Sequence, residues 1–364
     1  MSQKLRQQGV DARVITRSGP GLTRSTEVGG VPLERVGRGR GGKLVGGPSF
    51  VVEAVGRLYA QRRDYDVLHT HMMFSAMTIG LLTHWITGKP LIVNPHGRGP
   101  HGDVGKLIAQ GWLGRARLAA ARRSADAFVC ISPAIHEELR GMGAPAARLW
   151  DIPNGVDIDH FQPVAGRGDG TRLKLALGLP AQPAVVFAGR LAPVKGVEVL
   201  LRAWPEVLQA VPAAQLIILG EGELRAALET HSTQSGLKAS VRFIQGCHDV
   251  APYLQAADAF VLPSYSEGSP VALLEAMACG RPCVATANVG NLQVLTDNVT
   301  GRLVPVGEAG PLAAGLVEAL REPSAAAWGE RARAEVVQRY SLDTVAARYV
   351  ALYQALVRRE ARPA

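Results

Sequence analysis

Residues 259–286 change from the hydrophobic pattern of a strand to that of a helix and back again. Short apolar runs at residues 259–262 and 283–286 predict buried strands, and residues 271–279 between them predict a helix. Ser269 is placed to cap this helix, and Pro270 to be its first residue. A strand, a helix and a second strand in this order are typical of a parallel sheet, so the stretch predicts an α/β fold.

Two carboxylates belong to this stretch. Glu275 is the one charged residue in an otherwise apolar helix, which predicts that it is buried. Glu267 precedes the cap, with seven residues between the two glutamates. The loop after a parallel strand lies at the ligand-binding edge of an open sheet, and the backbone amides of Gly268 to Val271 would face the same space. The pattern favours a site for an anion beside a hydroxyl-rich group; the alternative is a structural buried glutamate.

Length and composition limit the classes of protein. A chain of 364 residues is too long for one ordinary core and predicts two domains, and 47% hydrophobic residues exclude wholesale disorder. A net charge of +9 allows anionic partners, but aromatic residues are only 5% and are not interleaved with basic ones, so nucleic acid is not favoured. The four cysteines lie in apolar segments and are typical of reduced thiols in a cytosolic protein.

Two segments bear on the cellular location. Residues 1–6 lack the apolar core of a signal peptide, and residues 70–88 are uncharged but contain histidines and hydroxyls. We therefore expect residues 70–88 to form a buried helix rather than a membrane span. A basic helix predicted at residues 107–124 could meet anionic lipid, or it could be a solvated face. The prediction is a cytoplasmic protein that can rest on the inner face of the membrane.

Strands and helices alternate through the rest of the chain. Further strands are predicted at residues 12–16, 67–71, 91–94, 127–131, 184–188, 215–219 and 241–244. Further helices are predicted at residues 1–8, 49–61, 133–140, 197–211, 307–320 and 342–358, with loops at 19–47 and a linker at 161–180. The pattern predicts two Rossmann-like domains that face a cleft, at residues 1–160 and 161–341, followed by a closing helix at 342–364.

Cationic and glycine-rich segments follow two of these strands. Arg190 and Lys195 lie between glycines after the strand at residues 184–188. Diphosphate binding is favoured over a role as a solvated basic loop, because arginine can bond two phosphate oxygens at once and lysine supplies a point charge. Gly220 and Gly222 form a turn after the next strand, which is a weak signal by itself.

Histidines follow strands in the first half of the chain. His96 ends the strand at residues 91–94 and could hydrogen-bond a sugar hydroxyl. His69, His71 and His101 could join it in a metal site, but no paired carboxylates lie near them in the sequence. The cysteine spacing also matches no zinc motif. The sequence therefore predicts no metal site.

Together these residues resemble the retaining glycosyltransferases of family 4, which have the GT-B fold, over nearly the whole chain. The sequences that carry the resemblance are Ser266-Glu-Gly-Ser-Pro270, Leu274-Glu-Ala-Met-Ala-Cys-Gly-Arg-Pro282, Pro95-His-Gly97, Asn154-Gly-Val-Asp157, and Arg190 with Lys195. Each motif is common by itself, but the combination is specific.

The resemblance implies a role for each candidate residue. Glu267 would bond the hydroxyls of the transferred sugar, and His96 would contact the sugar near the reacting carbon. The implied catalytic residues are Glu267, His96, Arg190 and Lys195, and the implied nucleotide site is Arg190, Lys195, Glu275, Gly220, Gly222, Gly268, Ser269 and Pro270. Glu275 would hydrogen-bond the ribose, and the two cations would stabilise the diphosphate as it leaves.

The resemblance also implies the reaction. We expect a metal-independent, retaining hexosyltransferase that uses a nucleotide-diphosphate sugar and no cofactor, with the leaving phosphate accepting the acceptor's proton. The acceptor would be a glycan or lipid-linked sugar of polysaccharide or cell-envelope biosynthesis, bound by the N-terminal domain, and the last helix would cross back onto that domain. The donor base, uridine or guanosine, and the identity of the acceptor are left open.

Two features depart from the family pattern. Its opening strand and glycine-rich loop are absent before Lys4, so the alternative function is a catalytically impaired nucleotide-sugar-binding protein. The family often has a glutamate a few residues after the glycine that Gly290 resembles, where this chain has Gln293, and we expect binding to survive this change. A sugar-nucleotide epimerase on the same fold would need acid–base carboxylates at the sugar, and no convincing set is evident.

Overall fold

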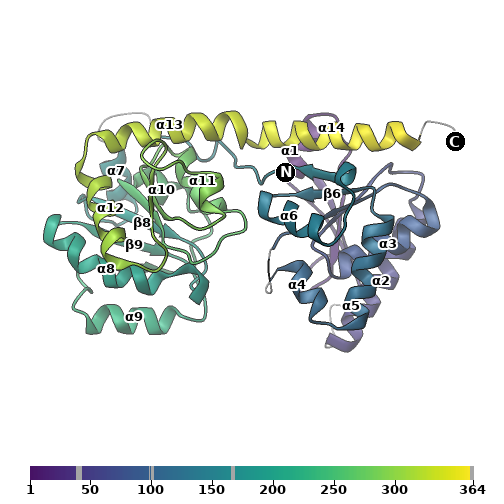
Figure 1. The fold of residues 1–364 in the computed structure, drawn as a ribbon, viewed down its shortest axis with the longest axis horizontal. Coiled ribbons are helices and arrows are strands. Elements are labelled where there is room, and N and C mark those ends of the chain that lie inside the picture. Colours follow the sequence, from purple (N-terminus) through teal and green to yellow (C-terminus); the bar gives the residue numbers. More distant parts are fainter. Residues whose placement is uncertain (38–42, 98, 100–101, 165–168, 361–364) are drawn as a thin grey trace. The chain divides into compact units, whose positions relative to one another are not determined.

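The computed structural model describes residues 1–37, 43–97, 99, 102–164 and 169–360 of the chain. It divides into two compact units (Figure 1): unit 1 comprises Met1–Pro153 and Asp343–Ala364, and unit 2 comprises Asn154–Leu342. Each unit has its own hydrophobic core around a parallel sheet. Each is therefore an α/β domain, as the alternation of strands and helices predicts.

The described residues of unit 2 form a six-stranded parallel sheet in the order β10-β9-β8-β11-β12-β13. The strands are β8 (Ala184–Ala188), β9 (Gln215–Leu219), β10 (Val241–Ile244), β11 (Ala259–Leu262), β12 (Cys283–Thr286) and β13 (Arg302–Val304). Counted from β8, this is the order 3-2-1-4-5-6 of a Rossmann sheet, which reverses between β8 and β11. Open α/β sheets bind ligands outside the carboxyl ends of the strands at such a reversal.

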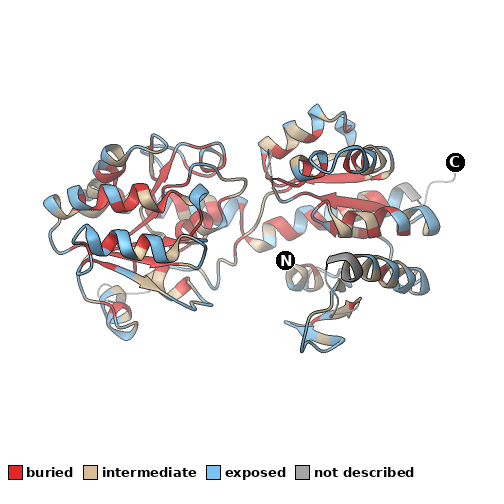
Figure 2. Cartoon of the chain, turned by 90° about the horizontal axis from the view of Figure 1, so that it is seen from below, coloured by how far each residue is buried: buried red, intermediate tan, exposed pale blue. Residues whose placement is uncertain are grey.

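Two groups of helices pack on this sheet. The first group is α8 (Val197–Ala210), α9 (Arg225–Gln234) and α12 (Ala309–Arg321), and the second is α7 (Asp169–Ala176), α10 (Ala251–Ala256), α11 (Val271–Ala278) and α13 (Ser324–Arg339). The central strands β8, β9, β11 and β12 are almost completely buried, whereas the outer faces of the helices are exposed (Figure 2). Helix α7 lies in the segment predicted as a linker. Its buried Lys174 donates to Asp258 (2.5 Å), a tertiary contact that the local sequence does not signal.

Unit 1 contains two sheets in its described residues. β4 (Leu68–His71), β5 (Leu91–Asn94), β6 (Ala127–Cys130) and β7 (Leu149–Asp151) form a parallel sheet in that order, and β1 (Val14–Arg17), β3 (Val31–Val36) and β2 (Ser25–Val28) form a smaller mixed sheet. The prediction of loops at residues 19–47 is therefore wrong. Gly29 and Gly30 make a two-residue hairpin turn between β2 and β3, and both have the positive φ that such a turn requires.

The helices of unit 1 surround the four-stranded sheet. They are α1 (Ser2–Gln7), α2 (Lys43–Ala60), α3 (Ser75–Thr87), α4 (Asp103–Ile108), α5 (Trp112–Ser124), α6 (Pro133–Gly141) and α14 (Leu342–Glu360). The single basic helix predicted at residues 107–124 is two helices, α4 and α5, interrupted at residues 109–111. Helix α14 follows unit 2 in the chain but buries Val345, Tyr349 and Leu352 in the core of unit 1. Across the described ranges, every helix is too short or too polar to cross a membrane.

Candidate functional site

Two loops meet where the strand order of unit 2 reverses. The loop after β8 carries Lys195, and the loop after β11 carries Glu267. The backbone N–H of Tyr265 donates to the carbonyl of Val194 (2.9 Å), which holds the two loops side by side. Lys195 Nζ lies 2.7 Å from Glu267 Oε1, and the two side chains are only 22% and 8% exposed. This shielded ion pair is the centre of the candidate site.

Hydrogen bonds fix the Glu267 carboxylate and also fix Ser264, the residue that donates to it. The Ser264 hydroxyl donates to Glu267 Oε1 (2.6 Å). The Ser264 carbonyl in turn accepts from Thr286 Oγ1 (2.5 Å) and Asn288 Nδ2 (3.0 Å), which belong to the end of the neighbouring strand β12 and the loop after it. Both bonds to the carboxylate use Oε1, so Oε2 has no hydrogen-bond donor among the described residues. That oxygen can accept from a ligand hydroxyl.

The glycine turn after β9 is bonded to the loop after β8. The N–H of Leu191 donates to the carbonyl of Glu221 (2.8 Å), between Gly220 and Gly222. The cationic loop after β8 and the glycine turn after β9 therefore lie together at the carboxyl ends of adjacent strands. Arg190 belongs to the same loop as Lys195, but its side chain is exposed and takes part in no ion pair within the described residues.

Helix α11 begins one residue later than the sequence predicts. α11 begins at Val271 with Pro270 in the capping position, so the prediction that Ser269 caps the helix and Pro270 begins it is wrong. The Ser269 hydroxyl instead accepts a hydrogen bond from Asn154 Nδ2 (3.0 Å). Local sequence could not reveal this, because Asn154 comes from a distant part of the chain. The contact ties the first residue of unit 2 to the segment that precedes α11.

Glu275 occupies a different environment from Glu267. Burial in α11 raises the pKa of Glu275 to about 7, and the charges of His160 and Asp249 act on it in opposite directions. His160 Nε2 and Asp249 Oδ1 form their own contact at 2.8 Å. No hydrogen bond joins Glu275 to Glu267 within the described residues. The two glutamates are therefore suited to different tasks, because Glu267 is paired with a cation and Glu275 has no ion-pair partner among the described residues.

His96 belongs to unit 1, just beyond the end of β5. Its backbone N–H donates to Asp103 Oδ2 (2.7 Å), and its Nε2 lies 3.0 Å from His71 Nδ1. The rings of His69 and His71 stack with centroids 4.5 Å apart, and His69 Nδ1 is 2.9 Å from the Tyr353 hydroxyl of α14. Burial, followed by the charge of His96, lowers the pKa of His71 to about 4. The sequence places the histidines at strand ends but does not show that they touch.

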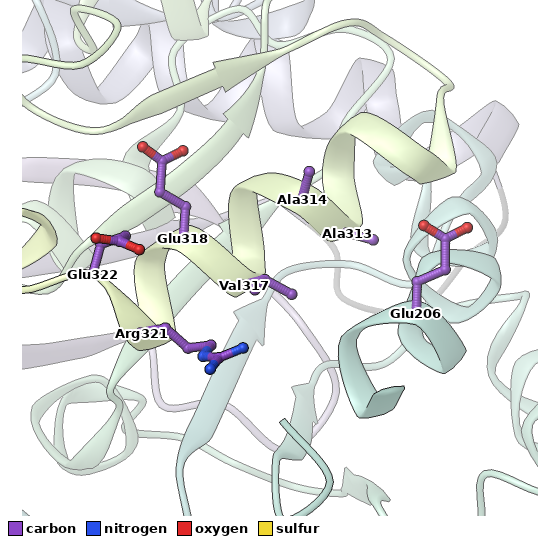
Figure 3. Close-up of a pocket in the computed structure, with 7 residues that line it drawn as sticks. All are labelled: Glu206, Ala313, Ala314, Val317, Glu318, Arg321 and Glu322. Atoms are coloured by element: carbon purple, nitrogen blue, oxygen red, sulfur yellow. The ribbon is translucent and has the colours of Figure 1, made fainter. Parts of the chain in front are cut away.

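His101, a candidate metal ligand in the sequence, lies outside the described residues. A hollow of unit 2 lies between α8 and α12, lined by Glu206, Val317 and Arg321 among others (Figure 3). Those side chains belong to the C-terminal halves of helices that start near the carboxyl ends of the strands, so the hollow is remote from the Lys195–Glu267 pair. We assign it no ligand.

Comparison with solved structures identifies the class of protein. Sucrose-phosphate synthase from Thermosynechococcus elongatus has a similar structure, with a TM-score of 0.81 and 25% identity, covering 98% of this chain and 92% of that one. Anabaena HepE in complex with UDP has a TM-score of 0.77 and 21% identity, covering 94% and 99% of the two chains. The two Rossmann-like units thus define a glycosyltransferase of the GT-B fold.

The sequence comparisons identify the family. The model of Glycosyl transferases group 1 matches residues 176–335, and that of the Glycosyl transferase 4-like domain matches residues 1–155. D-inositol 3-phosphate glycosyltransferase 2 of Catenulispora acidiphila is 30% identical over 306 residues, which cover 79% of this chain and 70% of that protein. D-inositol 3-phosphate glycosyltransferase of Mycobacterium tuberculosis is 32% identical over 283 residues, 71% of this chain but only about half, 54%, of that protein. The chain belongs to the glycosyl transferases group 1 family.

Proposed function

We propose that the protein transfers a sugar, with retention at the anomeric carbon, from a nucleotide-diphosphate donor to a glycan or lipid-linked acceptor. The observation that carries the proposal is the Lys195–Glu267 pair at the reversal point of the unit 2 sheet. A sugar diphosphate has oxygens for the ammonium and hydroxyls for the carboxylate. The pair therefore matches both halves of such a ligand.

The cations of the loop after β8 would hold the diphosphate. Lys195 would exchange part of its contact with Glu267 for a phosphate oxygen, and exposed Arg190 would close on the phosphates as a fork. Gly220, Gly222 and the backbone of Gly268 lie at the same sheet edge and would leave room for the phosphates. Because these groups favour the charge that develops on the departing diphosphate, they lower the barrier to transfer.

The two glutamates and His96 would take the remaining roles. Glu267 Oε2 would accept from hydroxyls of the transferred sugar, and Glu275 on α11 would accept from the ribose. His96 would contact the sugar near the reacting carbon. The leaving phosphate would take the acceptor's proton, so the proposed reaction uses no metal and no cofactor.

The names of similar proteins indicate which donor and acceptor substrates to test. HepE has been solved with UDP-glucose, which makes uridine the first donor base to test. The curated relatives are named for D-inositol 3-phosphate, so a phosphorylated polyol joins glycans and lipid-linked sugars among the acceptors to test. A role in polysaccharide or cell-envelope biosynthesis is part of the same proposal.

A paired binding and transfer experiment tests this function. The protein is screened by thermal shift against uridine and guanosine diphosphate sugars. Transfer to the acceptor classes named above is then followed by mass spectrometry, and the anomeric configuration of the product is determined by NMR. A donor at a hundred times its dissociation constant should stabilise the native state by about 2.7 kcal/mol. Binding with retention of configuration in the product supports the proposal. Saturable binding without hydrolysis or transfer to any acceptor would instead establish an inactive nucleotide-sugar-binding protein.

Peripheral contact with an anionic membrane is also part of the proposal. Ile108, Trp112 and Leu113 are 44%, 80% and 51% exposed where α4 gives way to α5. Lys106 and Arg115 are exposed beside them. Apolar side chains flanked by cations suit an interface that combines acyl chains with anionic headgroups.

Vesicle co-sedimentation tests the membrane contact. The full-length protein should bind vesicles that contain phosphatidylglycerol more strongly than neutral ones, and added salt should weaken this binding. A double variant with Trp112→Ser and Leu113→Ser should lose most of it. Leu175→Ser is the control, because Leu175 is also exposed (60%) but belongs to unit 2. Equal binding by the double variant and the control would overturn the assignment.

A further inference from the structure

Three potential metal ligands converge at one edge of the unit 1 sheet. They are Cys130, His136 and Asp151, whose ligand atoms all lie within 4.8 Å of one another. His136 Nδ1 is 2.8 Å from Asp151 Oδ1. The thiol is buried, with Cys130 only 1% exposed, whereas the imidazole and the carboxylate reach solvent. The cluster takes no part in the proposed transfer reaction.

Regular secondary structure positions all three ligands. Cys130 ends β6 and Asp151 ends β7, and the two residues are direct partners in the parallel pairing of these strands. Paired residues of adjacent strands project to the same face of a sheet, so the thiol and the carboxylate lie side by side. His136 comes from α6, which packs against both strands and is capped by Ser132. The cluster therefore does not depend on a loop to assemble it.

The ligand set matches the preferences of zinc. Zinc accepts thiolate, imidazole and carboxylate ligands at about 2.0–2.3 Å, and sites with three protein ligands leave a fourth tetrahedral position for water or another ligand. Calcium and magnesium prefer oxygen ligands only, and a single thiolate with an imidazole disfavours them. The Asp151 side chain is 67% exposed, so it can move the short distance needed to replace its contact with His136 by a metal bond.

We propose that Cys130, His136 and Asp151 bind one zinc ion that links β6, α6 and β7, with a fourth coordination position open to solvent. Binding breaks the S–H bond of Cys130, forms a zinc–sulfur bond and releases the proton to water. The dication then balances the charges of the thiolate and the Asp151 carboxylate. The zinc site is independent of the proposed function, since it needs only unit 1 residues.

A catalytic cysteine or a simple surface ion pair fits this cluster less well. A nucleophilic cysteine activated by a histidine must reach its substrate, but the Cys130 thiol is almost completely buried. A surface pair of His136 and Asp151 beside a packing cysteine accounts for the hydrogen bond. It does not explain why the ligand atoms of all three residues lie within 4.8 Å of one another.

Cobalt substitution tests the proposal in the full-length protein. The protein is stripped with a chelator under reducing conditions and titrated with Co²⁺, which reports thiolate ligation by a charge-transfer band and tetrahedral geometry by intense visible bands. We expect about one equivalent to bind and Zn²⁺ to displace it. His136→Ala and Asp151→Asn should each weaken binding at least about tenfold, in line with the loss of a metal ligand. Cys130→Ser should abolish the charge-transfer band.

A control variant and a second set of ligand variants make the outcome of the cobalt titration clear. Cys247→Ser, which removes a half-buried thiol in unit 2, should leave the band and the affinity unchanged. If Cys130→Ser does not fold, as judged by circular dichroism, the His136 and Asp151 variants decide, because their side chains reach solvent. The proposal is overturned if no stoichiometric charge-transfer band forms, if those two variants bind as tightly as the unaltered chain, or if Cys247→Ser removes the band.

Discussion

Lys195 and Glu267 are joined by a 2.7 Å contact although they follow strands β8 and β11, which are separated in the chain by two other strands. They meet because the sheet reverses its order between these strands. The ammonium neutralises the carboxylate, and the Ser264 hydroxyl holds the same oxygen. In the proposed function, a bound sugar diphosphate would compete with Glu267 for the lysine, and the pair would couple donor binding to the position of the carboxylate.

Replacing Glu267 should separate catalysis from donor binding. Glu267→Ala removes the proposed acceptor for the sugar hydroxyls but breaks the ion pair, which would free Lys195 for the phosphates. We expect kcat/KM for transfer to fall by about 100- to 1000-fold, roughly 3 to 4 kcal/mol, while the affinity for the nucleoside diphosphate stays equal or increases. Steady-state kinetics and calorimetric titration measure the two effects. A variant that transfers sugar at the unaltered rate would remove Glu267 from the site.

Glu275 should make stability depend on pH. Its pKa is raised by burial from 4.5 to about 7, so the folded state holds the proton more tightly than the unfolded state. The free energy of unfolding should therefore fall as pH increases from about 4.5 to about 7, by at most roughly 3 kcal/mol, and stay level above that range. Glu275→Gln should remove this slope and stabilise the protein at pH 8.

Denaturant unfolding at a series of pH values measures the effect of Glu275. Glu206→Gln, at an exposed glutamate of α8, is the matched control and should retain the slope. The same pair of variants separates a ribose contact from a packing role. Loss of nucleoside diphosphate affinity in Glu275→Gln alone indicates the contact, whereas unchanged affinity in both variants contradicts it.

Gly290 should be needed to keep Glu267 in place. A Cβ added at Gly290 would lie 2.5 Å from the carbonyl oxygen and 2.6 Å from the Cβ of Glu267. Gly290→Ala must therefore displace the Glu267 segment, and we expect transfer activity to fall at least about tenfold. Gly310→Ala is the control, because a Cβ there meets nothing within 4 Å. Equal activity of the two variants would mean that the position of Glu267 is not critical.

His71 should orient His96. The 3.0 Å contact between His71 Nδ1 and His96 Nε2 fixes which nitrogen of His96 can face a ligand. His71→Ala should lower kcat about five- to tenfold, the usual net value of one hydrogen bond, with little change in KM for the donor. His71→Asn should restore most of the rate, because its amide can occupy the place of Nδ1. Similar losses in both variants would indicate packing alone.

The sequence predicts those helices and strands whose ends are set by neighbouring residues in the chain. Strands β8 to β12 of unit 2 are short apolar runs between turn residues, and they occur where predicted, whereas β13 is not predicted. The sequence also places Lys195 and Glu267 in loops that follow strands. The family resemblance implies that they share one site, but local sequence does not predict their direct ion pair, because it depends on the order of the strands in the sheet. The β2–β3 hairpin is not predicted although its Gly29-Gly30 turn is a known signal, since the surrounding arginines and glycines suggest loops.

Contacts between distant segments account for the remaining differences. Ser269 is a good capping residue by type, but Asn154 bonds its hydroxyl and the helix begins later. Cys130, His136 and Asp151 are separated by five and fourteen intervening residues, a spacing of no recognised metal motif. The pairing of β6 with β7 and the packing of α6 against both strands bring them together.

The return of the last helix to unit 1 has a consequence for biosynthesis. Tyr349 and Leu352 of α14 complete the core of unit 1, whose other residues precede unit 2 in the chain, so unit 1 cannot complete its core until α14 has been translated. Unit 2, which is continuous in the chain, can finish folding earlier. In the interval the nascent protein exposes the apolar surface that α14 later covers, and this is the stage at which a chaperone has most to bind.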